Sequence, residues 1–245
     1  MPSYDFHLPR IHVEPDLHAD ARVALDRSQS HYLLNVMRRG GREVLVFNGH
    51  DGEWRARVEE TGRKSAELVV TDREREQTEP GDLHLLFAPL RKARLDYVVE
   101  KAVEMGASRI RPVVTDHVQN AHLRTDKLRI NAREAAEQCG VLSIPPLDEP
   151  ADLSDVLSDW DGERRLVFCD ERSDGASPVD VLSALPSGPA ALLVGPEGGF
   201  SPAERERLRS LPFVVVLPLG PRILRADTAA VAALALVQST VGDWR

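Results

Sequence analysis

The stretch "LLVGPEGGFSPAERERL", residues Leu192–Leu208, joins a short apolar run to a loop rich in glycine and then to a charged segment. The apolar run predicts a buried strand. Ser201-Pro202-Ala203-Glu204 has the composition of a capping box with proline at the first helical position, so a helix is predicted to begin there. The loop between them, Gly195-Pro196-Glu197-Gly198-Gly199, has no such structural explanation. Its glycines allow positive φ and let a ligand approach the backbone closely, although a tight turn without a ligand is the alternative.

A second unit of the same kind follows further along the chain. Another apolar run ends in "LPLGPRILR", Leu217–Arg225, which places a Gly-Pro pair and positive charge directly after a strand. In an open parallel sheet, ligands bind beyond the carboxyl ends of the strands. Neither loop matches GxGxxG or GxxxxGK[ST], so a dinucleotide-binding fold and a P-loop are not supported. Together the two loops predict one two-lobed pocket for a small molecule.

From Leu83 onward, apolar strands alternate with helical segments. Strands are predicted at 83–90, 109–114, 164–170, 189–195 and 213–220, and helices at 91–106 and about 125–139. Continuous apolar strands separated by helices indicate an α/β domain whose parallel sheet is covered on both faces. The chain closes with Thr228–Val241, which is apolar almost all round and predicts a helix buried in the core or between subunits.

The first seventy or so residues have a different pattern, with short strands predicted at 43–48, 53–59 and 65–71. Trp54, Ala56 and Val58 alternate with charged residues, which is typical of a half-buried strand. Ser28–Arg39 predicts a short helix that ends at a glycine pair. Several short strands with tight turns predict a small β-barrel. The charged segment Arg73–Asp82 is predicted to be a linker.

Composition limits the classes of function. The 245-residue chain has a formal net charge of −8, which argues against a protein that grips nucleic acid with its whole surface but allows a local basic patch. Its apolar runs are too short to span a bilayer and its N-terminus lacks the build of a signal peptide, so a cytoplasmic location is expected. Cys139 and Cys169 form no disulfide framework, and His117 and His122 give no metal-binding motif, so no metal is expected.

Three cations, Arg91, Lys92 and Arg94, crowd the predicted N-terminus of the first helix in the α/β region. The helix dipole disfavours positive charge at that end. Two explanations are open: a solvated helix face, or a cluster that meets phosphate.

At these motifs the sequence resembles a known family. The segments "LLVGPEGGFSPAE", "LPLGPRILRADTAAVAAL", "EKAVEMGASRIRPV" and "EAAEQCG" are similar to the 16S ribosomal RNA uridine-N3 methyltransferases of the SPOUT superfamily. "HYLLNVMRR", "VLVFNG" and "GEW" resemble that family's PUA-like barrel. The resemblance runs nearly end to end. It implies a PUA-like RNA-binding β-barrel at 1–72, a linker at 73–82 and a SPOUT methyltransferase domain at 83–245.

The resemblance implies further properties of the chain. The α/β domain is expected to carry a C-terminal trefoil knot, a rare exception among protein chains. The protein is expected to be a homodimer, to use S-adenosylmethionine as its methyl donor, and to act on 16S ribosomal RNA of the small ribosomal subunit. The cofactor pocket is expected to be lined by Leu193, Val194, Gly195, Gly198, Gly199, Leu217, Leu219, Gly220, Ile223 and Leu224.

The expected reaction transfers a methyl group to N3 of one uridine, which is protonated in the neutral base and therefore a poor nucleophile. Arg225 is the candidate for stabilising the negative charge that develops on the uracil carbonyls, and Asp227 or Glu197 for orienting that arginine or accepting the proton. For each carboxylate a purely structural ion pair is the alternative. The target base is expected to leave its stack to reach the pocket. RNA contacts are expected from Arg38, Arg39, Arg55, Arg57, Arg91, Lys92, Arg94 and Arg222.

The chain departs from the family pattern at three places. Ala226-Asp227 stands where Thr-Glu is usual, Val141 stands in place of an arginine, and Thr115–Asn120 lacks another. These changes concern RNA contact more than the reaction. Two other functions fit the same fold: a non-catalytic RNA-binding or ribosome-assembly factor, and a SPOUT methyltransferase for another RNA, such as transfer RNA. A Rossmann-type methyltransferase needs a glycine-rich turn after the first strand, and "FAPLRKARL" contains no glycine.

Overall fold

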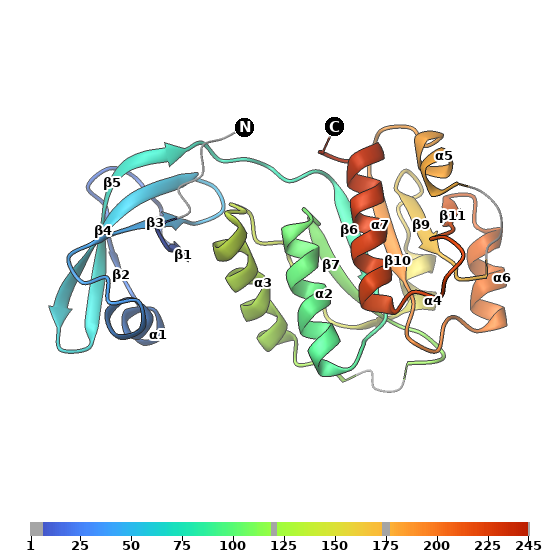
Figure 1. Ribbon diagram of the computed structural model, residues 1–245, viewed down its shortest axis with the longest axis horizontal. Coiled ribbons are helices and arrows are strands. Elements are labelled where there is room, and N and C mark those ends of the chain that lie inside the picture. Colours follow the sequence, from blue (N-terminus) through green and yellow to red (C-terminus); the bar gives the residue numbers. More distant parts are fainter. Residues whose placement is uncertain (1–6, 119–121, 173–176, 245) are drawn as a thin grey trace. The chain divides into compact units, whose positions relative to one another are not determined.

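The computed structural model describes residues 7–118, 122–172 and 177–244. It divides into two compact units, each of which is described by itself (Figure 1). Unit 1 comprises Met1–Glu79 and Arg133–Ile144, and unit 2 comprises Pro80–Ala132 and Pro145–Arg245. Helix α3 (Thr125–Cys139) begins in unit 2 and ends in unit 1.

Unit 1 is built on a five-stranded sheet in the order β1-β3-β4-β5-β2. The strands are β1 (Arg10–His12), β2 (Arg22–Ala24), β3 (Glu43–Phe47), β4 (Glu53–Gly62) and β5 (Ser65–Arg75). β1 runs parallel to β3, and the other neighbours are antiparallel. β1 and β2 form the edges, and no pairing between them is recorded among the described residues. Closure of this sheet into a barrel therefore stays a prediction. β5 also continues through Arg75, into the segment predicted as a linker.

The core of unit 1 follows the alternation seen in the sequence. Ala56 and Val58 are fully buried, Trp54 is half-buried, and Arg57 between them is exposed. These inward side chains pack with those of β3 and β5, as expected for a sheet with one buried face. The predicted period of two in this strand is confirmed.

The helix predicted at 28–39 is shorter than expected. α1 (Arg27–His31) begins at a capping box between Asp26 and Gln29 and continues into the π-helical turn η1 (Tyr32–Val36). Arg38 then has a φ of 52°, a left-handed conformation that ends the helical path before the glycine pair. The glycine stop was therefore the wrong terminator, because a non-glycine residue makes the turn.

A buried ion cluster links strand β1 of unit 1 to strands β4 and β5. The Glu53 side chain is 1% exposed and accepts hydrogen bonds from Arg10 Nε at 2.9 Å and from Arg75 Nε at 2.7 Å. Arg75 also donates to the backbone oxygen of Gly140 at 2.9 Å, within the same unit. Two guanidinium groups thus compensate one carboxylate that has no access to water.

Unit 2 contains a six-stranded sheet in the order β11-β9-β10-β6-β7-β8, and every recorded pairing in it is parallel. The strands are β6 (Leu83–Phe87), β7 (Arg109–Val114), β8 (Ala151–Asp152), β9 (Arg165–Cys169), β10 (Ala190–Val194) and β11 (Val214–Leu217). All but β8 were predicted. Every residue of β10 is buried, as expected for a central strand with both faces covered. Because the strands are parallel, their carboxyl ends share one edge of the sheet.

Helices cover this sheet. They are α2 (Lys92–Glu104), α4 (Leu153–Ser158), α5 (Pro178–Ser183), α6 (Pro202–Ser210) and α7 (Ala226–Thr240), together with the first part of α3. α2 and α7 lie side by side, and α5 packs against α7 and β11 (Figure 1). On the other face, Leu153 of α4 and Leu208 of α6 join a cluster with Phe168 and Leu193 of the strands. No helix among the described residues is long and apolar enough to cross a membrane.

The final helix, α7, is buried on one face and not all round. Its buried residues are Ala226, Ala229, Ala230, Ala233, Leu234, Val237 and Gln238. Val231, Ala232, Ala235 and Leu236 are only partly covered within this chain. The apolar composition predicted burial in the core or between subunits, and within the single chain only one side of the helix is covered.

Candidate functional site

The loop after β10 is shaped by two glycines, one through its backbone conformation and the other through a closely packed aromatic ring. Gly199 has a φ of 67°, and a methyl group on it would lie 2.7 Å from Glu171 Oε1. A methyl group on Gly195 would lie 2.5 Å from the ring of Phe200. The following helix, α6, begins with the predicted capping box between Ser201 and its third helical residue. The loop is therefore a tight, close-packed turn at the carboxyl edge of the sheet, which is the place in the fold that the sequence predicted for it.

The loop after β11 lies at the same edge and is more open. Gly220 has a φ of 93°, and a methyl group on it would meet no atom within 4 Å. Ile223 is 91% exposed, although it is strongly apolar. Because β9 lies between β10 and β11 in the sheet, the two loops leave strands that are one strand apart. Ile223 is thus an apolar side chain exposed beside an open glycine turn.

The residues predicted to bind the cofactor fall into two groups. The strand ends Leu193, Val194 and Leu217 are buried and form the base of the two loops. The loop residues are half-buried or exposed: Gly195, Gly198, Gly199, Leu219, Gly220, Ile223 and Leu224. Main-chain groups and apolar side chains at the end of a parallel sheet suit a small ligand with an aromatic ring.

Arg94 joins two of the three predicted catalytic residues. Its Nη1 atom donates to Glu197 Oε1 at 3.2 Å, and its Nε atom lies 3.8 Å from Asp227 Oδ2. One guanidinium therefore links the loop after β10, the first turn of α2 and the first turn of α7. Asp227 also lies where the dipole of α7 favours negative charge. Arg94 was predicted to contact RNA, and within the chain it organises the two carboxylates.

Arg225 and Arg91 occupy equivalent positions at two helix starts. Each is the N-cap residue of its helix, α7 and α2 respectively, with extended backbone, and each is exposed. Neither caps its helix through its side chain. Arg222, in the loop before α7, is exposed as well, whereas the side chain of Lys92 lies outside the described part of the structure.

His117 holds the glycine loop and was not predicted to do so. Its Nδ1 atom lies 3.1 Å from the backbone oxygens of both Gly198 and Gly199. Both partners are carbonyl acceptors, so Nδ1 carries the proton and donates it. The neighbouring Asp116 adds two bonds: its N–H donates to Glu204 Oε1 at 2.9 Å, and its Oδ2 accepts from Ser201 Oγ at 2.5 Å. The sequence signal for this role is Thr115-Asp116-His117, which directly follows strand β7 of the same sheet.

A second buried ion cluster fixes the end of β9. Asp170 is 2% exposed and accepts hydrogen bonds from Arg205 and, at 2.6 Å, from Arg209 Nη2. Arg205 also donates to Glu171 Oε1 at 2.8 Å. Burial lowers the pKa of Arg205 from its ordinary value. This cluster anchors α6, and with it the loop that precedes α6, to the edge of the sheet.

In unit 1, the arginines predicted to bind RNA are partly engaged with carboxylates. Arg55 is paired with Glu43 and Glu74, and Arg57 is paired with Glu59. Arg39 Nη2 donates to the backbone oxygen of His7 at 3.2 Å, and Arg38 is exposed. Pairing with glutamates, across strands for Arg55 and along the same strand for Arg57, leaves both arginines less available to phosphate than the sequence alone predicted.

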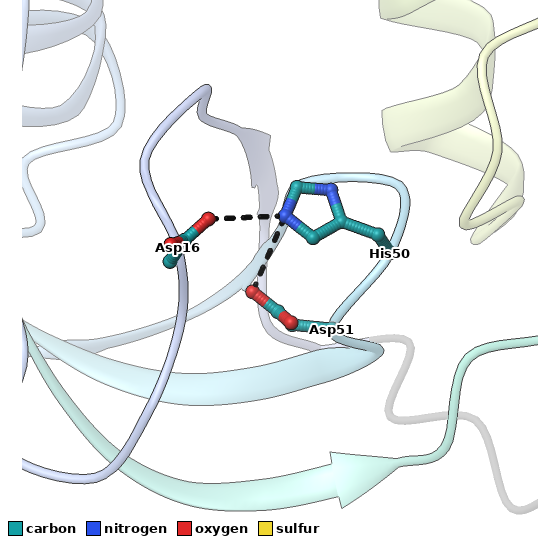
Figure 2. A group of neighbouring side chains, drawn as sticks. All are labelled: Asp16, His50 and Asp51. Carbon is teal, nitrogen blue, oxygen red and sulfur yellow. Dashed lines mark hydrogen bonds and ion pairs between the residues drawn. The ribbon is translucent and has the colours of Figure 1, made fainter.

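Asp16, His50 and Asp51 place three possible metal-ligand atoms within 4.8 Å of one another (Figure 2). Asp51 Oδ2 accepts hydrogen bonds from Leu17 N and Asn48 Nδ2, both at 2.7 Å. These bonds, led by that from Leu17, hold the pKa of Asp51 below its ordinary value. These hydrogen bonds explain the group as one that stabilises the turn after β3. The absence of a bound metal stays a prediction.

The two cysteines do not pair. Cys139 is exposed and Cys169 is buried, and no disulfide joins them. Burial raises the pKa of Cys169 to about 12. Neither thiol is part of the loops described above.

Residues 77–238 match a family described as RNA methyltransferase domain, and residues 25–71 match one described as RNA methyltransferase PUA domain. This chain belongs to the RNA methyltransferase family. The methyltransferase match covers both Gly-Pro loops, His117 and Arg94.

The relatives of this RNA methyltransferase match it along most of its length. Ribosomal RNA small subunit methyltransferase E of Rickettsia conorii is 27% identical over 232 residues, which cover 94% of each chain. The protein of the same name from Synechocystis is 29% identical and covers 94% of this chain and 77% of its own. A crystal structure of ribosomal RNA small subunit methyltransferase E from Neisseria gonorrhoeae bound to S-adenosyl methionine has a TM-score of 0.87 and 26% identity. That match covers 98% of this chain and all of the other.

Proposed function

We propose that this RNA methyltransferase transfers a methyl group from S-adenosylmethionine to N3 of one uridine in 16S ribosomal RNA of the small subunit. The observation that carries the proposal is the pair of Gly-Pro loops at the carboxyl edge of a parallel sheet, in a chain that is similar over nearly its whole length to a structure bound to S-adenosyl methionine. The relatives named as small subunit methyltransferases support the choice of RNA.

The methyl donor fits the loops on the evidence of their own packing. Gly198 and Gly220 are exposed and carry no side chain, so a ligand at the two loops would meet bare backbone there. Leu219, Ile223 and Leu224 supply the apolar surface for the adenine from the second loop. The donor contributes a methyl group on a positively charged sulfur, which makes that carbon open to attack by a nitrogen lone pair.

The residues of the chain must make uridine N3 a nucleophile. As the bond from N3 to the methyl carbon forms and the carbon–sulfur bond breaks, the N3 proton passes to a base, and negative charge spreads over the uracil carbonyls. Arg225, exposed at the start of α7, is placed to meet that charge. Asp227 is the proton acceptor in this scheme because Glu197 is the nearer partner of Arg94 and orients it.

RNA binding, assembly and location complete the proposal. Unit 1 would hold the RNA, in line with its match to the PUA family, and its sheet would close into a barrel. The RNA-binding barrel would comprise residues 1–72, the linker 73–82 and the methyltransferase domain 83–245. The half-covered apolar face of α7 would close against a second copy in a homodimer, and the C-terminal region would form the trefoil knot. The enzyme would work in the cytoplasm, where ribosomal subunits are assembled.

The test uses 16S ribosomal RNA and assembled small subunits from a strain that lacks the enzyme, with labelled methyl donor and the purified full-length chain. Mass spectrometry of the digested RNA should show one new N3-methyluridine. Labelling of transfer RNA in place of 16S RNA would indicate a different substrate. Donor binding without transfer to either RNA would indicate a non-catalytic factor, and both outcomes would overturn the proposal.

A further inference from the structure

Unit 1 carries a groove whose lining contains no carboxylate. It has a volume of about 560 Å³ and is lined by Arg27, His31, Asn35, Arg63 and Lys64. Arg27 and His31 belong to α1, Asn35 belongs to η1, and Arg63-Lys64 form the turn between β4 and β5. All five residues are exposed, and we call this group the α1–hairpin groove.

Several exposed cations of unit 1 outside this groove are paired with carboxylates, although Arg38 and Arg42, also exposed, have no recorded ion pair among the described residues. Arg22 is paired with Glu59 and Glu67, and Arg73 is paired with Glu76. Arg55 and Arg57 are paired as well, as described above. Among the described residues, by contrast, no carboxylate oxygen lies within 4.0 Å of the charged groups of Arg27, Arg63 or Lys64. In a chain of net charge −8, three such cations around one hollow form a local positive site.

The side chains that line the α1–hairpin groove suit a partner that carries phosphate groups. Two guanidinium groups and one ammonium group suit phosphate oxygens, which arginine can bind through two parallel hydrogen bonds. Asn35 and His31 are polar groups linked by a 3.1 Å hydrogen bond and offer further bonds to a phosphate or a 2′-hydroxyl. The lining has no aromatic residue other than this histidine, so it offers little surface for base stacking.

We propose that the α1–hairpin groove binds the phosphodiester backbone of the RNA substrate and positions it without reading its sequence. This inference rests on the proposed function, because it assumes that the substrate is RNA. It adds Arg27, Arg63 and Lys64 to the contacts predicted from the sequence for unit 1. Those were Arg38, Arg39, Arg55 and Arg57, of which Arg55 and Arg57 are paired with carboxylates. Backbone contacts of this kind fix register and orientation, while recognition of the target base takes place elsewhere.

The experiment compares two double variants of the full-length chain that remove the same charge from the same unit. Arg63→Gln/Lys64→Gln removes two groove cations, and Arg22→Gln/Arg73→Gln removes two carboxylate-paired cations. Binding to a 16S ribosomal RNA fragment is measured as a function of salt. Each phosphate contact contributes about 0.7–0.9 to the slope of log K against log[salt], so the groove variant should lose about 1.4–1.8. With an unchanged affinity at 1 M salt, that loss corresponds to about 25- to 60-fold weaker binding at 0.1 M salt.

The paired control should keep the wild-type slope, and both variants should keep the wild-type melting temperature and donor affinity. Adding Arg27→Gln to the groove variant should lower the slope further, and Arg63→Lys alone should keep it. A groove variant that binds RNA with the wild-type slope, while the wild-type enzyme methylates 16S RNA, would overturn this inference and leave the proposed function standing. A wild-type enzyme that fails to methylate any 16S RNA, while the groove variant still loses RNA affinity, would overturn the proposed function alone.

Discussion

Replacement of His117 by alanine removes the side chain whose Nδ1–H holds the backbone oxygens of Gly198 and Gly199, each at 3.1 Å. The histidine is exposed, and the two contacts share one proton, so together they count as one hydrogen bond of about 1 kcal/mol net. If the glycine loop must be ordered to bind the methyl donor, that loss raises the Kd for the donor about five-fold. Isothermal titration with S-adenosylmethionine measures it directly.

Two further variants separate this hydrogen bond from mere loss of packing. In His117→Asn, the side-chain amide nitrogen can take the place of Nδ1 and donate to the same carbonyls, so donor affinity should return to within two-fold of the wild type. In His117→Gln the amide lies one bond further out, near the place of Nε2, and affinity should stay low. Equal donor affinity in the alanine variant and the wild type would refute the reasoning, as would equal rescue by asparagine and glutamine.

Three other predictions follow from the structure. Arg225→Ala should abolish methyl transfer in the labelled-donor assay while donor affinity changes less than two-fold, and retained turnover would remove Arg225 from the mechanism. Glu53→Ala should lower the free energy of unfolding by about 3–5 kcal/mol, because it leaves Arg10 and Arg75 buried without their carboxylate. Urea titrations measure this change, and a loss below 1 kcal/mol would contradict the cluster's role. Burial lowers the pKa of His84 to about 4, below its ordinary 6.5. Between pH 6.5 and pH 4, His84 is therefore protonated in the unfolded chain and neutral in the folded chain. Stability should therefore fall as the pH drops from 6.5 to 4, and His84→Gln should show a smaller fall in the same titrations.

Regular elements could be predicted wherever local pattern and packing agree. β7 at Arg109–Val114 and α3 at Thr125–Cys139 coincide with the ranges expected from apolar runs and from a helix that ends before glycine. β1, β2 and β8 have only two or three residues each, too few for any period to show. The face of α7 that stays half-covered could not be predicted, because the helix is apolar on both sides and only the tertiary neighbours distinguish them.

The site was predictable to the extent that it depends on glycine and strand order. Gly-Pro pairs after two apolar strands located both loops, since parallel strands bring their carboxyl ends to one edge. The contact of Arg94 with Glu197 joins residues 103 positions apart, and sequence spacing carries no record of such a pair. The sequence shows His117 only as a loose pair with His122 in a polar stretch, whereas its hydrogen bonds to the glycine loop depend on tertiary packing. The pairing of Arg55 with Glu43 and Glu74 likewise depends on strand register.

Helix α3 has a consequence for anyone who wishes to dissect the protein. The chain enters unit 1, leaves it after Glu79, and returns for Arg133–Ile144, so a gene fragment that stops at residue 79 would encode an incomplete body. It would lack Glu137, which accepts the N–H of His12 at 2.9 Å, and the Gly140 oxygen that Arg75 contacts. Excision at a single cut would thus expose unsatisfied groups in the smaller piece. A fusion that splices residues 133–144 back onto the fragment is the rational way to express it alone.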